Sequence, residues 1–288
     1  HIKNLNITQY DAGHIPGSSS ILVKNGNKKL FYTGDINTAD TELLKKCRLP
    51  GKVDTLVTES TYSYRDHPPK NKETDKLRKK VKSIVSTGGQ VLIPAFAVGR
   101  SQEVLLMLEE FTDKMCLDGM SKKASDIMLS HGKYIKNEKK LKKVLDKTTW
   151  IKDHGQRKKA VKNFPVIVST AGMLHGGPAI YYLKRMRDWN DLHVLFTGFL
   201  VEDSPGRLLL KTGRFEGEEE EFNVKGAIDQ FDFSAHAGKS GLFSIIEKTN
   251  PSKVVCMHGD RCPEFAKEIE EKYDIEAIAP KNGDEIKC

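Results

Sequence analysis

The sequence predicts an α/β fold, because short apolar segments with the composition of β-strands alternate with longer segments of helical periodicity. Clusters of Gly, Pro, Asn and Asp separate the two kinds of segment, as turns do. The expected strands cover residues 21–23, 30–32, 53–58, 91–94, 166–168, 194–196 and 254–257. The expected helices cover residues 72–86, 103–111, 179–187 and 263–273.

The first sixty residues favour strands joined by turns. Asn, Gly and Asn occupy positions 25–27, between the apolar runs 21–23 and 30–32. This order predicts a β-hairpin, because the positive φ angles of a tight hairpin turn favour Gly and Asn. The next apolar run, 53–58, has the composition of a buried strand.

The first long helix is predicted over residues 72–86. Leu77, Val81 and Ile84 recur at helical spacing, so they fall on one face. The glycine pair at 88–89 ends the periodic pattern, as glycine commonly does just after a helix.

Each of the expected strands that follow ends at a turn containing glycine. Gly99, Arg100 and Ser101 follow strand 91–94, whereas Gly172 and Arg207 lie in the turns after the next two strands. Backbone amides at such turns can bind phosphate at a helix N-terminus, although any α/β protein needs turns of this kind. Arg100 makes its turn the better phosphate-binding candidate.

The charge of the chain is positive and unevenly distributed. The 288 residues have a formal net charge of +8, and residues 122–162 alone carry 14 Lys or Arg against 4 Asp or Glu. A positive region of this kind attracts polyanions such as nucleic acids. The same composition also fits a solvated, lysine-rich helical surface, so charge alone leaves both interpretations open.

The composition is that of an ordinary globular protein, with 38% hydrophobic and 30% charged residues. No apolar run is long enough for a membrane span, and no secretory signal pattern occurs. The five cysteines are widely spaced and form no CxxC pair, which indicates reduced thiols. We therefore expect a cytoplasmic protein without a membrane partner.

Four short segments place an ionisable side chain in a loop next to an expected strand. They end at or contain His14, Asp35, His236 and His258. Imidazole nitrogens and carboxylate oxygens are the zinc ligands of hydrolytic sites, and loops can gather them from distant parts of a sequence. Each histidine could equally be an ordinary surface or core residue, and spacing alone does not decide between the two.

Five motifs in order resemble the signature of the β-CASP nucleases, a family with the metallo-β-lactamase fold. They are Gly13-His14 with Gly17-Ser18, Tyr32-Thr33-Gly34-Asp35, Glu59-Ser60-Thr61-Tyr62, Phe233-Ser234-Ala235-His236 and His258-Gly259. The stretches 94–103 and 169–173 are also similar to this family. The family includes the endonuclease subunit of the cleavage and polyadenylation specificity factor, its archaeal relatives and the RNase J enzymes.

The resemblance implies a role for each motif residue. His14 and His258 would be metal ligands, and Asp35 would bridge two zinc ions. His236 would act as the general acid that protonates the leaving oxygen, with Glu59 orienting its imidazole ring.

The resemblance also implies the substrate, which would be single-stranded RNA. In having histidine at position 258, the sequence resembles the RNA-processing branch of the family. Ser234 would contact the scissile phosphate, and Gly99, Arg100, Ser101, Gly172 and Arg207 would meet other phosphates.

The implied fold is a metallo-β-lactamase αββα sandwich built from residues 1–63 and 232–288. A β-CASP domain would occupy residues 64–231. The family's His-x-His-x-Asp-His segment does not occur in this sequence. We therefore expect a fragment that lacks the N-terminal part of the sandwich, rather than a reduced, metal-poor relative.

The functional hypothesis is a zinc-dependent RNA phosphodiesterase, an endoribonuclease that could also trim from the 5′ end. The alternative is a non-catalytic RNA-binding subunit of a processing complex. A hydrolase of small esters or thioesters on the same metal scaffold is a third option, and the chain could also form a homodimer.

Overall fold

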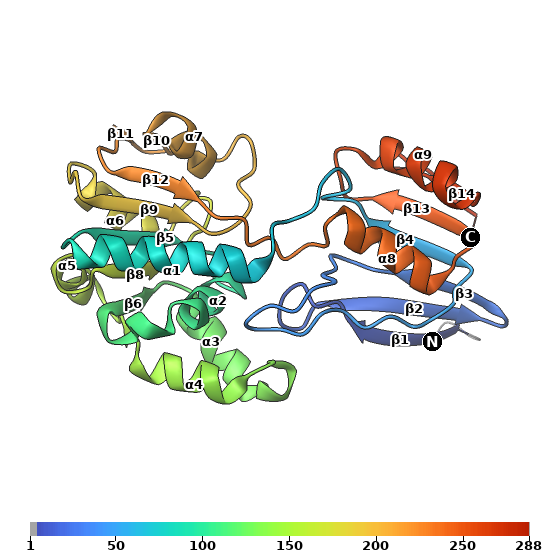
Figure 1. Ribbon diagram of the computed structural model, residues 1–288, viewed down its shortest axis with the longest axis horizontal. Helices are drawn as coiled ribbons and strands as arrows, with labels where there is room; N and C mark the ends of the chain where they lie inside the picture. The colour runs from blue at the N-terminus through green and yellow to red at the C-terminus, as the bar shows by residue number, and fades with distance from the viewer. Residues whose placement is uncertain (1–4, 288) are drawn as a thin grey trace. The chain divides into compact units, whose positions relative to one another are not determined.

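The computed structural model describes residues 5–287, which form two compact units (Figure 1). Unit 1 comprises the described residues up to His67 and those from Ala235 onward, and unit 2 comprises Pro68–Ser234. The sequence prediction placed the domain boundaries after residues 63 and 231, a few residues earlier in each case. That division into domains stays a prediction.

Unit 1 contains a six-stranded mixed sheet with the order β1-β2-β3-β4-β13-β14. The first three strands form an antiparallel meander, and β3, β4, β13 and β14 run parallel. Their bounds are β1 Leu5–Asp11, β2 Ser19–Asn25, β3 Lys28–Tyr32, β4 Thr55–Glu59, β13 Lys253–Met257 and β14 Glu276–Ile278. The hairpin predicted around residues 25–27 is therefore present as β2–β3.

The core of unit 1 lies between this sheet and two helices, α8 (Lys239–Thr249) and α9 (Cys262–Tyr273). One row of paired residues crosses the sheet and is fully or nearly buried: Leu22, Phe31, Leu56, Val254 and Ala277. Phe243 and Phe265 of the two helices stack edge to face, with ring centroids 5.4 Å apart. Strand alternation therefore places these side chains on the face of the sheet that α8 and α9 cover.

The described part of unit 1 thus supplies one sheet and one helix layer of the predicted αββα sandwich. The opposite face of the sheet also carries apolar side chains, and Ile7 on it is 61% exposed.

Unit 2 contains a six-stranded sheet whose pairings are all parallel, with the order β12-β9-β5-β8-β6-β7 (Figure 1). Its strands are β5 Gln90–Pro94, β6 Met115–Asp118, β7 Thr149–Trp150, β8 Val166–Ser169, β9 Leu192–Phe196 and β12 Ala227–Gln230. Parallel strands need crossover connections, which here are helices. A short hairpin, β10 (Arg214–Glu216) and β11 (Glu221–Asn223), precedes β12.

The described residues of unit 2 include seven α-helices and two 3₁₀ helices, and all of them except α1, which precedes β5, lie in the connections between its parallel strands. They are α1 Lys70–Ser86, α2 Arg100–Met107, η1 Glu109–Lys114, α3 Ser121–Ser130, η2 Gly132–Tyr134, α4 Glu138–Lys147, α5 His154–Asn163, α6 Pro178–Met186 and α7 Pro205–Thr212. The bounds predicted for α1, α6 and α9 agree within two residues. The helix predicted over 103–111 was misplaced, because the chain becomes helical directly at Arg100 and changes to a 3₁₀ helix after Leu108.

None of the helices between residues 5 and 287 combines the length and apolar character that a membrane span requires.

Candidate metal centre

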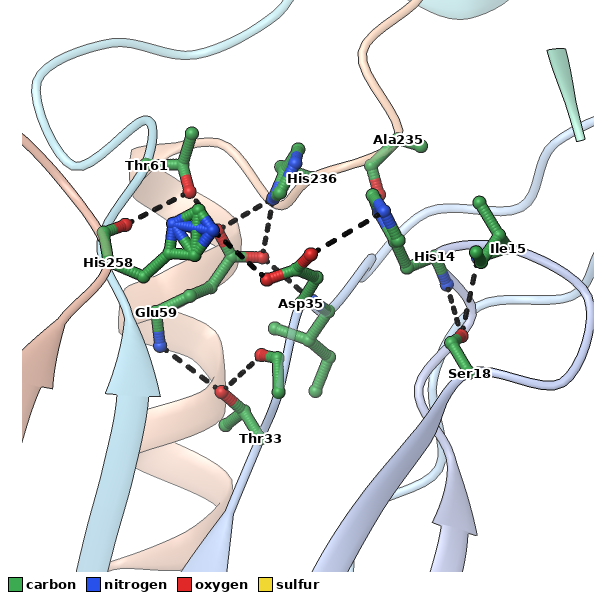
Figure 2. A network of polar contacts seen from close by, with 12 residues as sticks. His14, Ile15, Ser18, Thr33, Asp35, Glu59, Thr61, Ala235, His236 and His258 are labelled. Carbon is green, nitrogen blue, oxygen red and sulfur yellow. Dashed lines mark hydrogen bonds and ion pairs between the residues drawn. The ribbon is translucent and has the colours of Figure 1, made fainter. Parts of the chain in front are cut away.

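The candidate metal centre lies in unit 1, at the edge of the sheet where parallel strands end (Figure 2). Glu59 is the last residue of β4, Asp35 follows β3, and His258 directly follows β13. Because the carboxyl ends of parallel strands meet at one edge, three segments that are distant in sequence bring their side chains together. His14 and His236 join them from the loops after β1 and before α8.

The ring of His14 is oriented by a contact with a backbone carbonyl. Its Nδ1 lies 3.0 Å from the carbonyl oxygen of Ala235, so Nδ1 donates a hydrogen bond and Nε2 is left with its lone pair. Burial lowers the pKa of His14, which also favours the neutral ring. A neutral imidazole with an available Nε2 has the protonation state that a metal ligand requires.

Gly13 permits this arrangement because its φ angle is +69° and its Cα lies close to other backbone. A Cβ at this position would come within 2.7 Å of the Cys47 amide nitrogen. The loop that presents His14 can therefore adopt its path only with glycine here.

The carboxylate of Asp35 lies between two imidazoles. Its Oδ2 is 3.7 Å from Nε2 of His14, and its Oδ1 is 3.5 Å from Nε2 of His258. Both distances exceed those of ordinary hydrogen bonds. Two ligand atoms that share one tetrahedral zinc ion, each about 2.1 Å from it, lie about 3.4 Å apart. The donor atoms therefore have the chemistry and the spacing of ligands around a shared ion, on both sides of the carboxylate.

His236 and Glu59 form a close pair beside these residues. Nδ1 of His236 lies 2.9 and 2.8 Å from the two carboxylate oxygens of Glu59. Glu59 is buried and also accepts hydrogen bonds from the Thr61 hydroxyl at 2.5 Å and the Ile36 amide at 2.7 Å. Burial raises the pKa of Glu59, but these hydrogen bonds outweigh it, so the pKa lies below the ordinary value.

The pKa of His236 shifts in the opposite direction. Burial lowers the pKa of its imidazole, yet the hydrogen bond and the negative charge of Glu59 outweigh burial and raise the pKa above the ordinary value. His14, His236 and Asp35 have potential ligand atoms within 4.8 Å of one another. The distances therefore allow His236 to be a ligand, whereas the raised pKa favours a proton on its ring; its role as the general acid stays a prediction.

His258 is held by its backbone in an uncommon conformation. It has a φ angle of +53°, and its carbonyl oxygen accepts a hydrogen bond from the Ser60 amide at 3.3 Å and lies 3.1 Å from the Thr61 hydroxyl oxygen. A Cβ on Gly259 would come within 2.3 Å of the Ser60 carbonyl oxygen. The close approach of the ends of β4 and β13 therefore fixes the direction in which His258 leaves the sheet.

Sequence reasoning did not find two of the contacts that organise this site. The carbonyl of Ala235 is a backbone group, so no side-chain pattern could indicate it. Thr61 stood within a quoted motif without a role. The signal in the sequence was a residue with a hydroxyl group two positions after Glu59.

The predicted phosphate-binding residues lie in unit 2, and several already have partners there. The Gly99 amide donates to Oε1 of Gln102, and both the amide and the hydroxyl of Ser101 donate to the Phe96 carbonyl. Arg100 is 9% exposed, pairs with Glu103 at 2.7 Å and donates to the Phe233 carbonyl. The phosphate contacts stay predictions.

The other three predicted phosphate-binding residues are Gly172, Arg207 and Ser234. Gly172 lies against the backbone of Phe96, with 3.0 Å between the position of a Cβ and the Phe96 amide nitrogen. Arg207 pairs with Glu202 at 3.2 Å near the start of α7. Ser234 is buried at the end of unit 2. Their roles also stay predictions.

The basic segment 122–162 is mostly helical. In α4, Leu141, Val144 and Leu145 face the core of unit 2, which leaves Lys142 and Lys143 exposed. The lysines therefore occupy a solvated helix surface, one of the two interpretations that composition left open. A surface of this kind remains able to attract a polyanion.

Two family descriptions match the chain. Residues 101–209 match the Beta-Casp domain, and residues 221–280 match the Zn-dependent metallo-hydrolase RNA specificity domain. The chain is 35% identical over 298 residues to Probable RNase MJ4 of Methanocaldococcus jannaschii, and the match covers 100% of the chain and 70% of that relative.

The chain belongs to the β-CASP family. It is also 38% identical to RNase aCSPSF2 of Saccharolobus solfataricus, over 99% of the chain and 59% of that relative. It is 31% identical to Integrator complex subunit 11 of Danio rerio, over 97% of the chain and 49% of the relative. The chain thus spans between about half and 70% of the length of these β-CASP relatives.

These matches confirm the resemblance inferred from the five motifs. The mixed α/β architecture with two largely parallel sheets, together with the two matched domains, confirms the metallo-β-lactamase and β-CASP fold class.

Proposed function

We propose that this β-CASP chain carries the catalytic part of a metal-dependent ribonuclease that hydrolyses phosphodiester bonds in single-stranded RNA. Two of its relatives are named RNases. The domain description matched by residues 221–280 refers to RNA specificity. The site in unit 1 offers the residue types that such a reaction requires.

The observation that carries the proposal is the position of Asp35 between His14 and His258. An ordinary structural ion pair would bring the groups to hydrogen-bonding distance, whereas these are 3.5 and 3.7 Å apart. Such spacing suits a carboxylate that shares one ion with each imidazole. Asp35, His14 and His258 would therefore hold the two zinc ions of the proposed centre.

When bound, such ions polarise the oxygens of a phosphodiester and lower the pKa of a water molecule toward neutrality. His14 and His258 would hold their neutral rings toward the centre, and Asp35 would offset the positive charge. The Ala235 carbonyl keeps the proton of His14 on Nδ1. This contact supports the metal-ligand role because it fixes the tautomer.

His236 would protonate the leaving oxygen. The ribose oxygen is a poor leaving group as an alkoxide, so a proton donated from Nε2 of His236 would assist its departure. Glu59 holds Nδ1 of the same ring and favours its charged form. The raised pKa of His236 supports this role, since the acid must carry its proton near neutral pH.

RNA as the substrate is supported by charge. The exposed lysines of α4 and the formal net charge of +8 would attract the phosphate backbone. We extend the proposal to endonucleolytic cleavage in the cytoplasm, with 5′ trimming as a further activity.

The test is zinc content together with cleavage of a labelled single-stranded RNA, measured for the unsubstituted chain and for Asp35→Asn. We expect zinc to bind to the unsubstituted chain and to fall in the variant, together with cleavage. Asp203→Asn is the matched control, because Asp203 is exposed in unit 2 and the substitution removes the same charge. Equal zinc content and equal cleavage in Asp35→Asn and the unsubstituted chain would contradict the proposal.

The second candidate is a non-catalytic RNA-binding subunit of a processing complex. It is favoured by the relative that is named as a subunit of a complex. RNA binding without zinc and without cleavage would support this candidate instead.

A further inference from the structure

A second candidate site lies in unit 2, along the edge of its sheet. An open groove of about 420 Å³ runs between the edge strand β7 and helix α5. Its volume falls within the range of about 300–1,000 Å³ that is typical of small-molecule sites. It is lined by Thr149, Trp150, Ile151, Lys152, Gln156, Lys159, Ala160, Asn163 and Phe164.

One face of α5 forms a wall of this groove. Gln156, Lys159, Ala160 and Asn163 are spaced three or four residues apart, so they fall on the same side of the helix. Ala160 is buried, whereas the other three side chains are exposed. The wall therefore combines a cation and two polar side chains with a small apolar centre.

The opposite side of the groove carries an aromatic ring in a fixed position. Trp150 lies on β7, the last strand in the sheet order, and its indole Nε1 donates to the Leu145 carbonyl at 3.0 Å. Phe164, at the end of α5, is the second aromatic residue of the lining. Rings that are already held in place can stack on a flat ligand with little loss of conformational freedom.

The two lysines of the lining are Lys152 and Lys159. Both are exposed, and neither forms an ion pair within residues 5–287, although Asp153 adjoins Lys152 in the sequence. Their surroundings are also positive, since the segment 122–162 has 14 Lys or Arg against 4 Asp or Glu. The groove therefore favours a ligand that is both aromatic and anionic.

We propose that this groove binds one nucleotide unit of a single-stranded RNA, with the base against Trp150 and the phosphate near Lys152 and Lys159. The inference rests on the proposed function only in taking RNA as the ligand. It adds an RNA contact in unit 2 that is separate from the predicted phosphate-binding residues. Charge complementarity and the fixed indole ring select a nucleotide over a neutral metabolite.

The fluorescence of Trp150 gives a direct test. The chain has two tryptophans, so a Trp189→Phe variant reports on Trp150 alone. The titrations use the whole chain with EDTA present, so that RNA cleavage does not interfere. The probes are a twelve-residue oligoadenylate, adenosine 5′-monophosphate, adenosine, and ribose 5-phosphate.

We expect oligoadenylate and adenosine monophosphate to quench the emission, with weaker binding by adenosine and no quenching by ribose phosphate. Trp150→Leu should weaken oligoadenylate binding by about 5- to 150-fold, the range for loss of one stacked base. Lys159→Ala should lower the slope of log K against log salt by about 1, and Lys158→Ala, on the same helix outside the lining, serves as the comparison.

Quenching by adenosine monophosphate without quenching by oligoadenylate would overturn the assignment to RNA. Equal affinities for adenosine and its monophosphate would overturn the role of the lysines. Unchanged emission with every probe would refute the site as a whole. The proposed function is read separately, from zinc content and cleavage, so either proposal can fail while the other stands.

Discussion

The two units end their parallel strands in different ways. At the carboxyl edge of the sheet in unit 1, His14, Asp35 and His258 point toward one another across distances of 3.5 and 3.7 Å. At the corresponding edge of unit 2, Asp118 accepts two bonds from Arg157 and one from the Tyr182 hydroxyl. In unit 1 the potential metal-ligand atoms lie beyond ordinary hydrogen-bonding distance of one another. In unit 2 the carboxylate of Asp118 accepts close hydrogen bonds instead.

The difference shows which polar clusters are built for a ligand. Asp118 is buried, and its bonds to Arg157 at 2.6 and 3.2 Å complete its hydrogen bonding, so it stabilises the fold. Asp35 has no contact of comparable closeness to either imidazole, and its side chain is 39% exposed. An accessible group of potential ligand atoms at this spacing is the better candidate for chemistry.

The largest expected effect comes from removing the acid in unit 1. His236→Gln keeps a polar side chain but cannot donate a proton as an imidazolium does. We expect RNA cleavage to slow by about 10²- to 10⁴-fold, the usual contribution of a general acid. Zinc content measured on the same samples should remain at the level of the unsubstituted chain. A loss of zinc in proportion to activity would make His236 a ligand instead.

The next largest effect is expected from a substitution that breaks the contact between Asp118 and Arg157 in unit 2. Asp118→Asn leaves the Arg157 guanidinium without its buried counter-charge, and we expect a loss of about 3 kcal/mol in the free energy of unfolding. Urea denaturation measures this, with Glu271→Gln as the control, because Glu271 belongs to an exposed pair with Lys267 at 3.7 Å. A stability loss as small as that of the control would show that Asp118 does not hold the fold.

A smaller effect is expected from the group that orients Glu59. Thr61→Val removes the hydroxyl that donates to Glu59 and lies 3.1 Å from the His258 carbonyl oxygen, at nearly constant volume. We expect cleavage or zinc affinity to fall by about 10- to 100-fold, as for other groups behind metal ligands. Thr61→Ser restores the hydroxyl and should recover most of the loss; no recovery would point to packing of the methyl group.

The smallest effect concerns the charge of Arg100. If Arg100 meets phosphate, Arg100→Gln should reduce the slope of log K against log salt for RNA binding by about 1. Glu103→Gln should then strengthen binding by a few-fold, because Glu103 pairs with Arg100 at 2.7 Å. Opposite changes from the two variants are the expected result. A loss of folding stability in both variants with unchanged RNA affinity would make the pair structural.

Much of the fold could be predicted from local sequence, whereas the members of the candidate site followed from the resemblance to a family, because spacing alone left the role of each histidine open. Glycine and asparagine fixed the hairpin at residues 25–27, and apolar spacing located α1 and α9 within two residues. The prediction failed for α2, where a local capping signal was overlooked. The predicted start at residue 103 ignored the Gly99 cap, whose amide bonds to Gln102.

Sequence by itself determined which groups occupy the strand ends, since each candidate side chain lies in a short motif beside a strand. Only the tertiary structure decided how these groups meet. The contact between His14 and Ala235 joins residues 221 positions apart, and the His236–Glu59 contact spans 177. Such contacts depend on how the sheet brings its loops together, so the tautomer of His14 and the pKa of His236 follow from the fold rather than from any local pattern.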